Sequence, residues 1–158
     1  CDLILQASPM HDVGKIGIRD NILLKPGKLE GDEWVNMKTH VEIGVSILSG
    51  GDSKIIQLAQ EIAATHHEKY DGTGYPNGLK GEEISIPGRI VPICDVFDAL
   101  TSVRPYKKAW TVEDAVDLLK QEKGKHFDPD LVDRFISILP EILEIRERYS
   151  ETPLDAVA

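Results

Sequence analysis

Two adjacent histidines, His66 and His67, lie where a strong helical pattern gives way to a loop rich in glycine and proline. Before the pair, apolar side chains recur at the spacing of one helix face, at Ile55, Leu58, Ala59, Ile62 and Ala63. Both imidazoles therefore leave the end of one helix together. Imidazole is the commonest metal ligand near neutral pH, so the pair is a candidate for metal binding. A core or capping role is the alternative that these residues alone leave open.

The connection that follows, over residues 68–88, is too long for a simple turn. It carries five glycines, two prolines and the turn dipeptides Asp71-Gly72 and Asn77-Gly78. Loops longer than about 12–15 residues without regular structure are uncommon and often functional. We predict an ordered wall rather than a linker, because the segment has apolar anchors at Tyr70, Tyr75, Leu79 and Ile84.

The rest of the chain repeats the period of a helix and shows no sustained two-residue alternation, so the fold class is all-α. One helix is predicted from Asp32 or Glu33 to Leu48, and another over Arg89–Ser102. Residues 1–10 are predicted to be the last turns of a buried helix. Pro92 is tolerable only if its helix begins close before it. Helix N-caps are predicted at Ser53, Thr111 and Asp128.

Composition excludes several classes of protein. The chain has 158 residues, 41% hydrophobic and 28% charged, as expected for one globular domain. No apolar run approaches the roughly 20 residues of a membrane span, so no membrane contact is predicted. Two cysteines, Cys1 and Cys94, indicate a reducing compartment, which we take as cytoplasmic. A net charge of −9 argues against binding to a nucleic-acid polymer, but allows a small phosphorylated ligand.

Further candidate ligands are scattered along the sequence. His11 and Asp12 are adjacent, a pair that suits two metal ions sharing a carboxylate, and Lys15 follows four residues after His11. His40 lies on the edge of an apolar helix face, where a packing role is the alternative. Asp95 and Asp98 are one turn apart in an apolar helix, where a metal ion or a surface location would compensate them.

A compact basic cluster, Arg104 to Lys108, follows in this acidic chain. It suits either a phosphate or a solvated turn. Taken together, four histidines and two aspartates spread over four segments predict a metal site inside a helical bundle. Mixed nitrogen and oxygen ligands without thiolate suit Fe, Mn or Zn.

The order of these motifs resembles the HD-GYP domain of the HD phosphohydrolase superfamily. The resemblance covers about residues 9–132 and rests on residues 11–18 (HDVGKIGI), 25–28 (KPGK), His40, 66–68 (HHE), 71–79 (DGTGYPNGL), 89–90 (RI), 95–102 (DVFDALTS), 104–107 (RPYK) and 126–129 (HFDP). Arg19 and Pro92 depart from the family's common residues. The resemblance implies an HD-domain helical bundle.

The resemblance also implies an activity: hydrolysis of cyclic di-GMP to pGpG and often GMP, with two or three divalent metal ions, frequently iron or manganese. The implied metal ligands are His11, Asp12, His40, His66, His67 and Asp95. Asp12 would bridge two ions, and Lys15 would touch a phosphate oxygen or help protonate the leaving group, which makes these two the implied catalytic residues. Lys15, Tyr75, Asp98, Arg104 and Lys107 resemble the family's substrate contacts.

The same resemblance sets expectations for domains and partners. Residues 1–149 are expected to form the HD-GYP domain and residues 150–158 a frayed tail. A helix before Cys1, supplying a further histidine and in some members a glutamate, is expected in a longer protein, as is an upstream receiver or sensory domain. The Gly72–Leu79 loop is a possible contact for a diguanylate cyclase (GGDEF) partner.

Two other functions compete with cyclic di-GMP hydrolysis. The first is a catalytically weak or inactive module that binds a cyclic dinucleotide or a diguanylate cyclase. The second is an HD hydrolase for another nucleotide, such as cyclic GMP-AMP or a guanosine polyphosphate. The complete set of ligand residues argues against the first, and substrate competition would separate the second.

Overall fold

The all-α prediction is confirmed by a computed structural model, which describes residues 2–103 and 108–149; these residues contain helices and no named strand. The α-helices are α1 (Asp2–Ala7), α2 (Asp20–Leu23), α3 (Asp32–Lys38), α4 (His40–Leu48), α5 (Lys54–Thr65), α6 (Ile86–Thr101), α7 (Val112–Gln121), α8 (Pro129–Ser137) and α9 (Leu139–Tyr149). Three 3₁₀ turns complete them: η1 (Ser8–Met10), η2 (Val13–Gly17) and η3 (Gly81–Glu83). Within these ranges, no helix is both long and apolar enough to cross a membrane.

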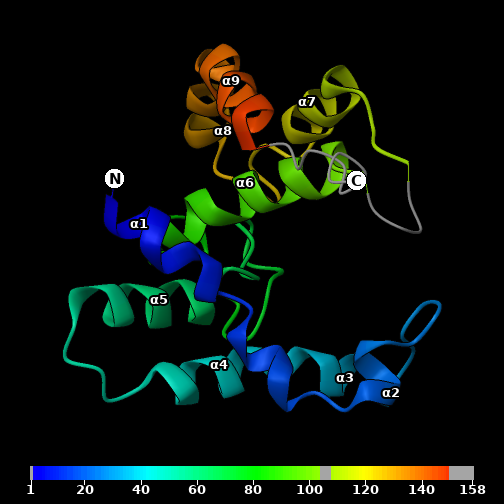
Figure 1. Cartoon of the computed structure of the whole chain (residues 1–158), viewed down its shortest axis with the longest axis vertical. Coiled ribbons are helices and arrows are strands. Elements are labelled where there is room, and N and C mark those ends of the chain that lie inside the picture. Colours follow the sequence, from blue (N-terminus) through cyan, green and yellow to red (C-terminus); the bar gives the residue numbers. More distant parts are fainter. Residues whose placement is uncertain (1, 104–107, 150–158) are drawn as a thin grey trace, which may run out of the picture.

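Helix α6 runs through the middle of the molecule, with α7, α8 and α9 on one side and α1 and α5 on the other (Figure 1). One apolar cluster joins α6 to α7 and α8, and comprises Ile93, Phe97, Leu100, Ala115, Val116, Leu119, Phe127, Val132 and Phe135. A second joins α6 to α1, α4 and α5, and comprises Ala7, Leu48, Ala59, Ile62, Ala63 and Val91. Helix α6 therefore packs against both apolar clusters, one on each of its sides.

All three predicted N-caps are confirmed. The Ser53 hydroxyl accepts a hydrogen bond from the Ile56 amide at 3.2 Å, and the Thr111 hydroxyl accepts one from the Asp114 amide at 3.1 Å. The carboxylate of Asp128 caps α8 through two amides, those of Asp130 and Leu131. Each bond satisfies an amide that the first helical turn leaves without an intrahelical acceptor.

The prediction of one helix from Asp32 or Glu33 to Leu48 is wrong, because the helix is interrupted at Thr39, between α3 and α4. The Thr39 amide donates to the Asn36 carbonyl at 3.0 Å, and the Thr39 hydroxyl donates to the same carbonyl at 2.7 Å. This tight turn closes α3 and makes His40 the first residue of α4. His40 is consequently buried at a helix start rather than at the edge of a continuous apolar face.

Two further expectations are corrected at α1 and α6. Helix α1 is not a buried helix: Ala7 is fully buried, whereas Leu3 and Leu5 are 42% and 76% exposed. Helix α6 begins at Ile86, where Ser85 caps the Gly88 amide, so Pro92 lies well inside the helix. Asp95 and Asp98 are exposed on α6, so water solvates their carboxylates.

Candidate metal centre

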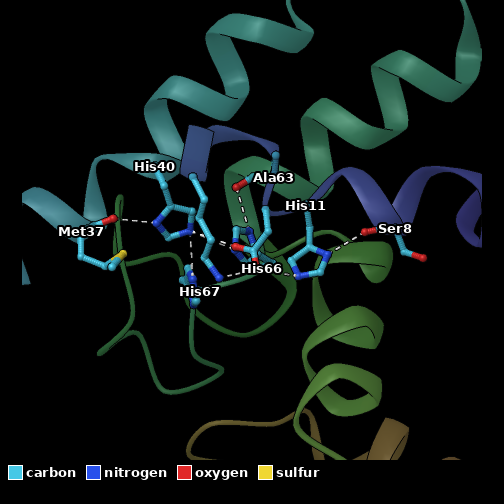
Figure 2. A network of polar contacts seen from close by, with 9 residues as sticks. Ser8, His11, Met37, His40, Ala63, His66 and His67 are labelled. Carbon is cyan, nitrogen blue, oxygen red and sulfur yellow. Dashed lines mark hydrogen bonds and ion pairs between the residues drawn. The ribbon is translucent and has the colours of Figure 1, made fainter. Parts of the chain in front are cut away.

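Four side chains from three separate segments converge on one point: Asp12, His40, His66 and His67. Each offers one ligand atom, and these atoms all lie within 4.8 Å of one another. Asp12 immediately precedes η2, His40 opens α4, and the two adjacent histidines follow the end of α5. Figure 2 shows the imidazole rings gathered where these elements meet. The predicted assembly of these four residues is thus present in the fold.

A glycine permits the approach of the first two segments. A Cβ atom on Gly14 would lie 1.9 Å from the carbonyl oxygen of His40 and 2.4 Å from the amide nitrogen of Gly44. No side chain fits between η2 and α4 at such distances. The absence of a side chain at Gly14 therefore brings Asp12 against the first turn of α4.

The rings of three histidines are oriented by backbone carbonyls. Nδ1 of His40 lies 2.7 Å from the Met37 carbonyl, and Nδ1 of His66 lies 2.9 Å from the Ala63 carbonyl. Nδ1 of His11 lies 2.7 Å from the carbonyl of Ser8 (Figure 2). A carbonyl only accepts, so each Nδ1 must be the donor. In the neutral ring, Nε2 then carries a free lone pair, the arrangement usual for metal-ligating histidine.

These lone pairs face one another and a carboxylate. Nε2 of His40 lies 3.4 Å from Nε2 of His66, and both nitrogens lie near Oδ1 of Asp12, at 3.4 and 3.7 Å. Oδ1 is buried and has no hydrogen-bond partner among the described residues. Buried acceptors that meet without a shared proton are unfavourable unless a cation lies between them. The donor set fits a divalent metal ion.

The protonation states of the cluster also suit a cation. Burial opposes ionisation of Asp12, but contacts with His11, His66 and Lys15 outweigh it and hold the pKa of Asp12 well below its ordinary value. Burial lowers the pKa of His40 and, together with the two neighbouring imidazoles, lowers the pKa of His67 to about 3. A side chain must be deprotonated to bind a metal ion, and these pKa shifts keep Asp12, His40 and His67 deprotonated at neutral pH.

Lys15 lies at the mouth of the cluster. Its ammonium is 2.6 Å from Oδ2 of Asp12, the oxygen that does not face His40. The side chain of Lys15 is 41% exposed, so its ammonium lies between the carboxylate and solvent.

His11 and Asp95 lie beside the four-residue cluster rather than within it. Nε2 of His11 is 3.3 Å from Oδ2 of Asp12, and this contact raises the pKa of His11. The negative charge of Asp95, exposed on α6, adds to that rise. Among the described residues, the converging ligand group therefore contains neither His11 nor Asp95, although His11 contacts the Asp12 carboxylate through Oδ2.

The remaining predicted substrate contacts are more dispersed. The Tyr75 ring stacks on the His67 imidazole, with centroids 4.7 Å apart, and burial followed by the charge of Asp12 raises the pKa of Tyr75 to about 12. Asp98 accepts a hydrogen bond from Ser102 and lines an apolar groove of about 990 Å³ between α6, α8 and α9. None of the cluster residues lines that groove. Arg104 and Lys107 lie outside the described residues.

Glu68 belongs to the quoted residues 66–68, but the sequence assigned it no role, and the structure shows that it anchors the loop. It is 2% exposed, and its two carboxylate oxygens accept the amides of Asn77 and Leu79 at 2.8 and 3.0 Å. These bonds tie the far side of the loop to the residue following the histidine pair, and so hold Tyr75 over His67. The sequence does place this carboxylate directly between the histidine pair and the glycine-rich segment, which is the one indication of its role.

Comparison with known proteins gives a consistent assignment. A family model described as the HD domain matches residues 4–131. The chain is 53% identical over 145 residues to the 3′3′-cGAMP-specific phosphodiesterase 2 of Vibrio cholerae, covering 92% of this chain and 28% of that protein. It is 49% identical over 148 residues to the cyclic di-GMP phosphodiesterase response regulator of Xanthomonas campestris, and the match covers 94% of this chain and 39% of that protein.

Other comparisons agree. The cyclic di-GMP phosphodiesterase of Thermotoga maritima is 49% identical over 145 residues, covering 92% of this chain and 39% of that protein. A crystal structure of a cyclic GMP-AMP specific phosphodiesterase of V. cholerae shares the fold, with a TM-score of 0.63 at 16% identity, covering 89% of this chain and 38% of that one. The chain spans 28% to 39% of the length of these three curated relatives. The chain belongs to the HD domain family, and its motifs place it among the HD-GYP members.

Proposed function

We propose that this chain is the hydrolase domain of a cyclic dinucleotide phosphodiesterase, which cleaves cyclic di-GMP to pGpG, GMP or both. The observation that carries the proposal is the buried Oδ1 of Asp12, left without a partner among the converging Nε2 atoms of His40 and His66. The names of three relatives that match more than nine-tenths of the chain support the substrate class. They give no support to the alternative of an inactive binding module.

The metal would be held first by the four converging residues, with His11 and Asp95 completing a set for two or three ions. We infer iron or manganese from the resemblance to HD-GYP domains, since imidazole and carboxylate donors without thiolate suit these two metals and zinc alike. When bound, divalent ions of this kind activate water as a nucleophile and neutralise charge on a phosphodiester. The described residues fix the donors for this role through the carbonyls of Ser8, Met37 and Ala63.

The chain's own side chains supply the remaining chemistry. Lys15, whose ammonium contacts Asp12, is proposed to touch a phosphate oxygen or to help protonate the departing sugar oxygen. Tyr75, Asp98, Arg104 and Lys107 are proposed to bind the substrate. Local cations of this kind explain how a chain with a net charge of −9 can bind an anion.

A second candidate substrate is 3′3′-cyclic GMP-AMP. One relative, 53% identical, is named as specific for it, and two relatives at 49% identity are named for cyclic di-GMP. The two dinucleotides share the sugar–phosphate ring and differ in one base. The cluster of Asp12 and the histidines acts on the shared part. Competition between the two substrates in one assay measures the preference.

The proposal also extends to the surroundings of the domain. We propose residues 1–149 as the HD-GYP domain, a cytoplasmic location, and an upstream receiver or sensory domain in a longer protein. The Gly72–Leu79 loop is proposed to contact a diguanylate cyclase. Thr73, Pro76, Asn77 and Gly78 on this loop are exposed, which suits a contact surface.

The test is to measure bound metal and cyclic di-GMP turnover together, for this chain and for a chain extended upstream of Cys1. Turnover that is lost on chelation and restored by Mn²⁺ or Fe²⁺ supports the proposal. If only the longer chain is active, the upstream helix supplies essential ligands. If neither chain binds metal or turns over substrate, yet dinucleotide still binds, the domain is a receptor and the catalytic roles are wrong.

A further inference from the structure

An aromatic corner formed by Trp34 and Tyr75 lies beside the candidate metal centre, and neither residue belongs to the group of converging ligands. The ring of Trp34, on α3, meets the ring of Tyr75 edge to face, with centroids 6.5 Å apart and planes at 76°. The Lys38 ammonium lies over both rings, 4.8 Å from the Tyr75 centroid and 5.7 Å from the Trp34 centroid. This arrangement joins α3 to the glycine-rich loop through cation–π and ring contacts.

Trp34 is unusually exposed for so large a side chain. It is 45% exposed, and α3 has no buried residue at all. The indole is therefore not a core anchor that happens to reach the surface. Its contacts with Tyr75 and Lys38 hold the ring in place while leaving much of its area to solvent. A fixed, solvent-facing aromatic plane is the usual form of a stacking platform for nucleobases.

One intervening ring, that of Tyr75, connects the Trp34 indole to the candidate metal centre. Tyr75 stacks on the His67 imidazole at 4.7 Å, and Trp34 is the next ring outward. A phosphate at the cluster would therefore have an indole two ring contacts away, within the reach of a nucleotide's base. Among the described residues, two other aromatic side chains are strongly exposed, and neither is part of this corner: Trp110 precedes α7 and Tyr149 ends α9.

Charge also suits a nucleotide at this place. Lys38 and Lys15 bring two ammonium groups to the rim of the cluster, one over Tyr75 and one on Asp12. A cyclic dinucleotide carries two phosphates, so a cation away from the scissile phosphate is useful.

We propose that the exposed face of Trp34 stacks a purine base of the substrate, with Lys38 setting the angle of the indole. This inference rests on the proposed function and names a subsite of it. Stacking uses the π-face that every purine has and does not read substituents. The subsite therefore contributes equally to cyclic di-GMP and 3′3′-cyclic GMP-AMP, and base selectivity must come from other residues.

The kinetic test compares Trp34→Ala, Trp34→Phe and a control, Val35→Ala, in metal-loaded protein. Val35 is a neighbour on α3 that is 65% exposed. Trp34→Ala is expected to raise KM roughly tenfold for both dinucleotides, the size of one lost base stack, with kcat and bound metal unchanged. Trp34→Phe should restore most of the affinity, and Val35→Ala should match the parent protein.

A binding test does not depend on turnover. The chain has two tryptophans, so Trp110→Phe leaves Trp34 as the only indole reporter. Titration with cyclic di-GMP should quench its fluorescence, and titration with inorganic phosphate should not. An unchanged KM in Trp34→Ala, or dinucleotide binding without quenching, overturns the inference. A fall in kcat together with metal loss also overturns it, since Trp34 would then act by holding the cluster. An inactive parent protein that still shows quenching refutes the proposed hydrolysis but keeps the subsite.

Discussion

The Nε2 atoms of His40 and His66 lie 3.4 Å apart with lone pair facing lone pair, because each ring donates its Nδ1 hydrogen to a backbone carbonyl. When both rings are neutral, their Nε2 atoms are acceptors that repel at this distance, and the buried Oδ1 of Asp12 adds a third acceptor. The fold holds this arrangement through helix starts and ends rather than through contacts within the cluster. The free energy of metal binding therefore includes relief of this repulsion, and it reports how far the fold preorganises the site.

The first prediction concerns Asp12→Asn. The amide keeps the shape of the carboxylate but removes its charge, so metal affinity should fall sharply. Binding to the native state stabilises a protein by about 2.7 kcal/mol when free metal is a hundredfold above Kd. Thermal unfolding with and without Mn²⁺ should therefore show a metal-dependent rise in Tm for the parent protein and almost none for the variant. Asp52→Asn, at an exposed carboxylate, is the control and should keep the full rise.

The second prediction concerns the glycines between η2 and α4. Gly14→Ala places a Cβ atom 1.9 Å from the His40 carbonyl oxygen, so the two segments must separate. We expect a loss of several kcal/mol in the free energy of unfolding, within the range for overpacking and backbone strain, and a loss of metal binding.

Gly44→Ala is the matched control for Gly14→Ala. It lies in the same interface, but its Cβ would meet Gly14 at 3.4 Å and Ala63 at 3.7 Å, which are ordinary contacts. Denaturant unfolding should therefore place Gly44→Ala near the parent protein. Equal destabilisation by the two variants would contradict the close approach at Gly14.

Features that depend on near neighbours in the sequence were predictable. The caps at Ser53, Thr111 and Asp128 each bond an amide two or three residues ahead, so a local pattern is sufficient. The break at Thr39 was not predictable from apolar spacing, because the spacing continues through it. A hydroxyl competing for the Asn36 carbonyl decides the break, and periodicity does not record that contact.

For features that depend on distant segments, the sequence could predict which residues belong to the site but not how they are arranged. The histidines and Asp12 could be grouped by residue type, but the ring orientations come from the carbonyls of Met37 and Ala63. Likewise, the exposure of Asp95 follows from how α6 packs and not from its apolar neighbours in the sequence. The anchoring role of Glu68 could not be predicted, because its partners, nine and eleven residues later, become neighbours only when the loop folds back.

The third prediction concerns that carboxylate. Glu68→Ala leaves the amides of Asn77 and Leu79 without their acceptor, at a cost of about 1–3 kcal/mol for each unsatisfied donor that stays buried. Glu68→Gln keeps one acceptor oxygen and should cost less. Limited proteolysis should cut the Gly72–Leu79 loop faster in both variants, and fastest in Glu68→Ala. The exposed Glu82→Ala is the control, and equal cleavage in all proteins would refute the anchoring role.

The fourth prediction concerns pH and the metal-free protein. The pKa of His67 is about 3 in the fold and about 6.5 in the unfolded chain. Between these values the unfolded chain binds a proton that the folded protein does not, so His67 makes the folded state less stable as pH falls from 6.5. A buried, lowered pKa at His40 acts with the same sign, whereas the raised pKa of His11 acts with the opposite sign.

Comparing the parent protein with His67→Gln isolates this contribution, since the other groups remain in both. In chelator-treated protein, the free energy of unfolding of the parent should fall relative to the variant by up to about 1.4 kcal/mol for each pH unit below 6.5. Asp12 does not disturb the comparison between pH 7 and pH 5, because it is ionised in the fold and its unfolded pKa is near 3.9. Urea unfolding at pH 7, 6 and 5 measures the difference. A difference that stays constant with pH would show that His67 takes up its proton in the folded state, and that the cluster does not keep this ligand ready for a metal ion.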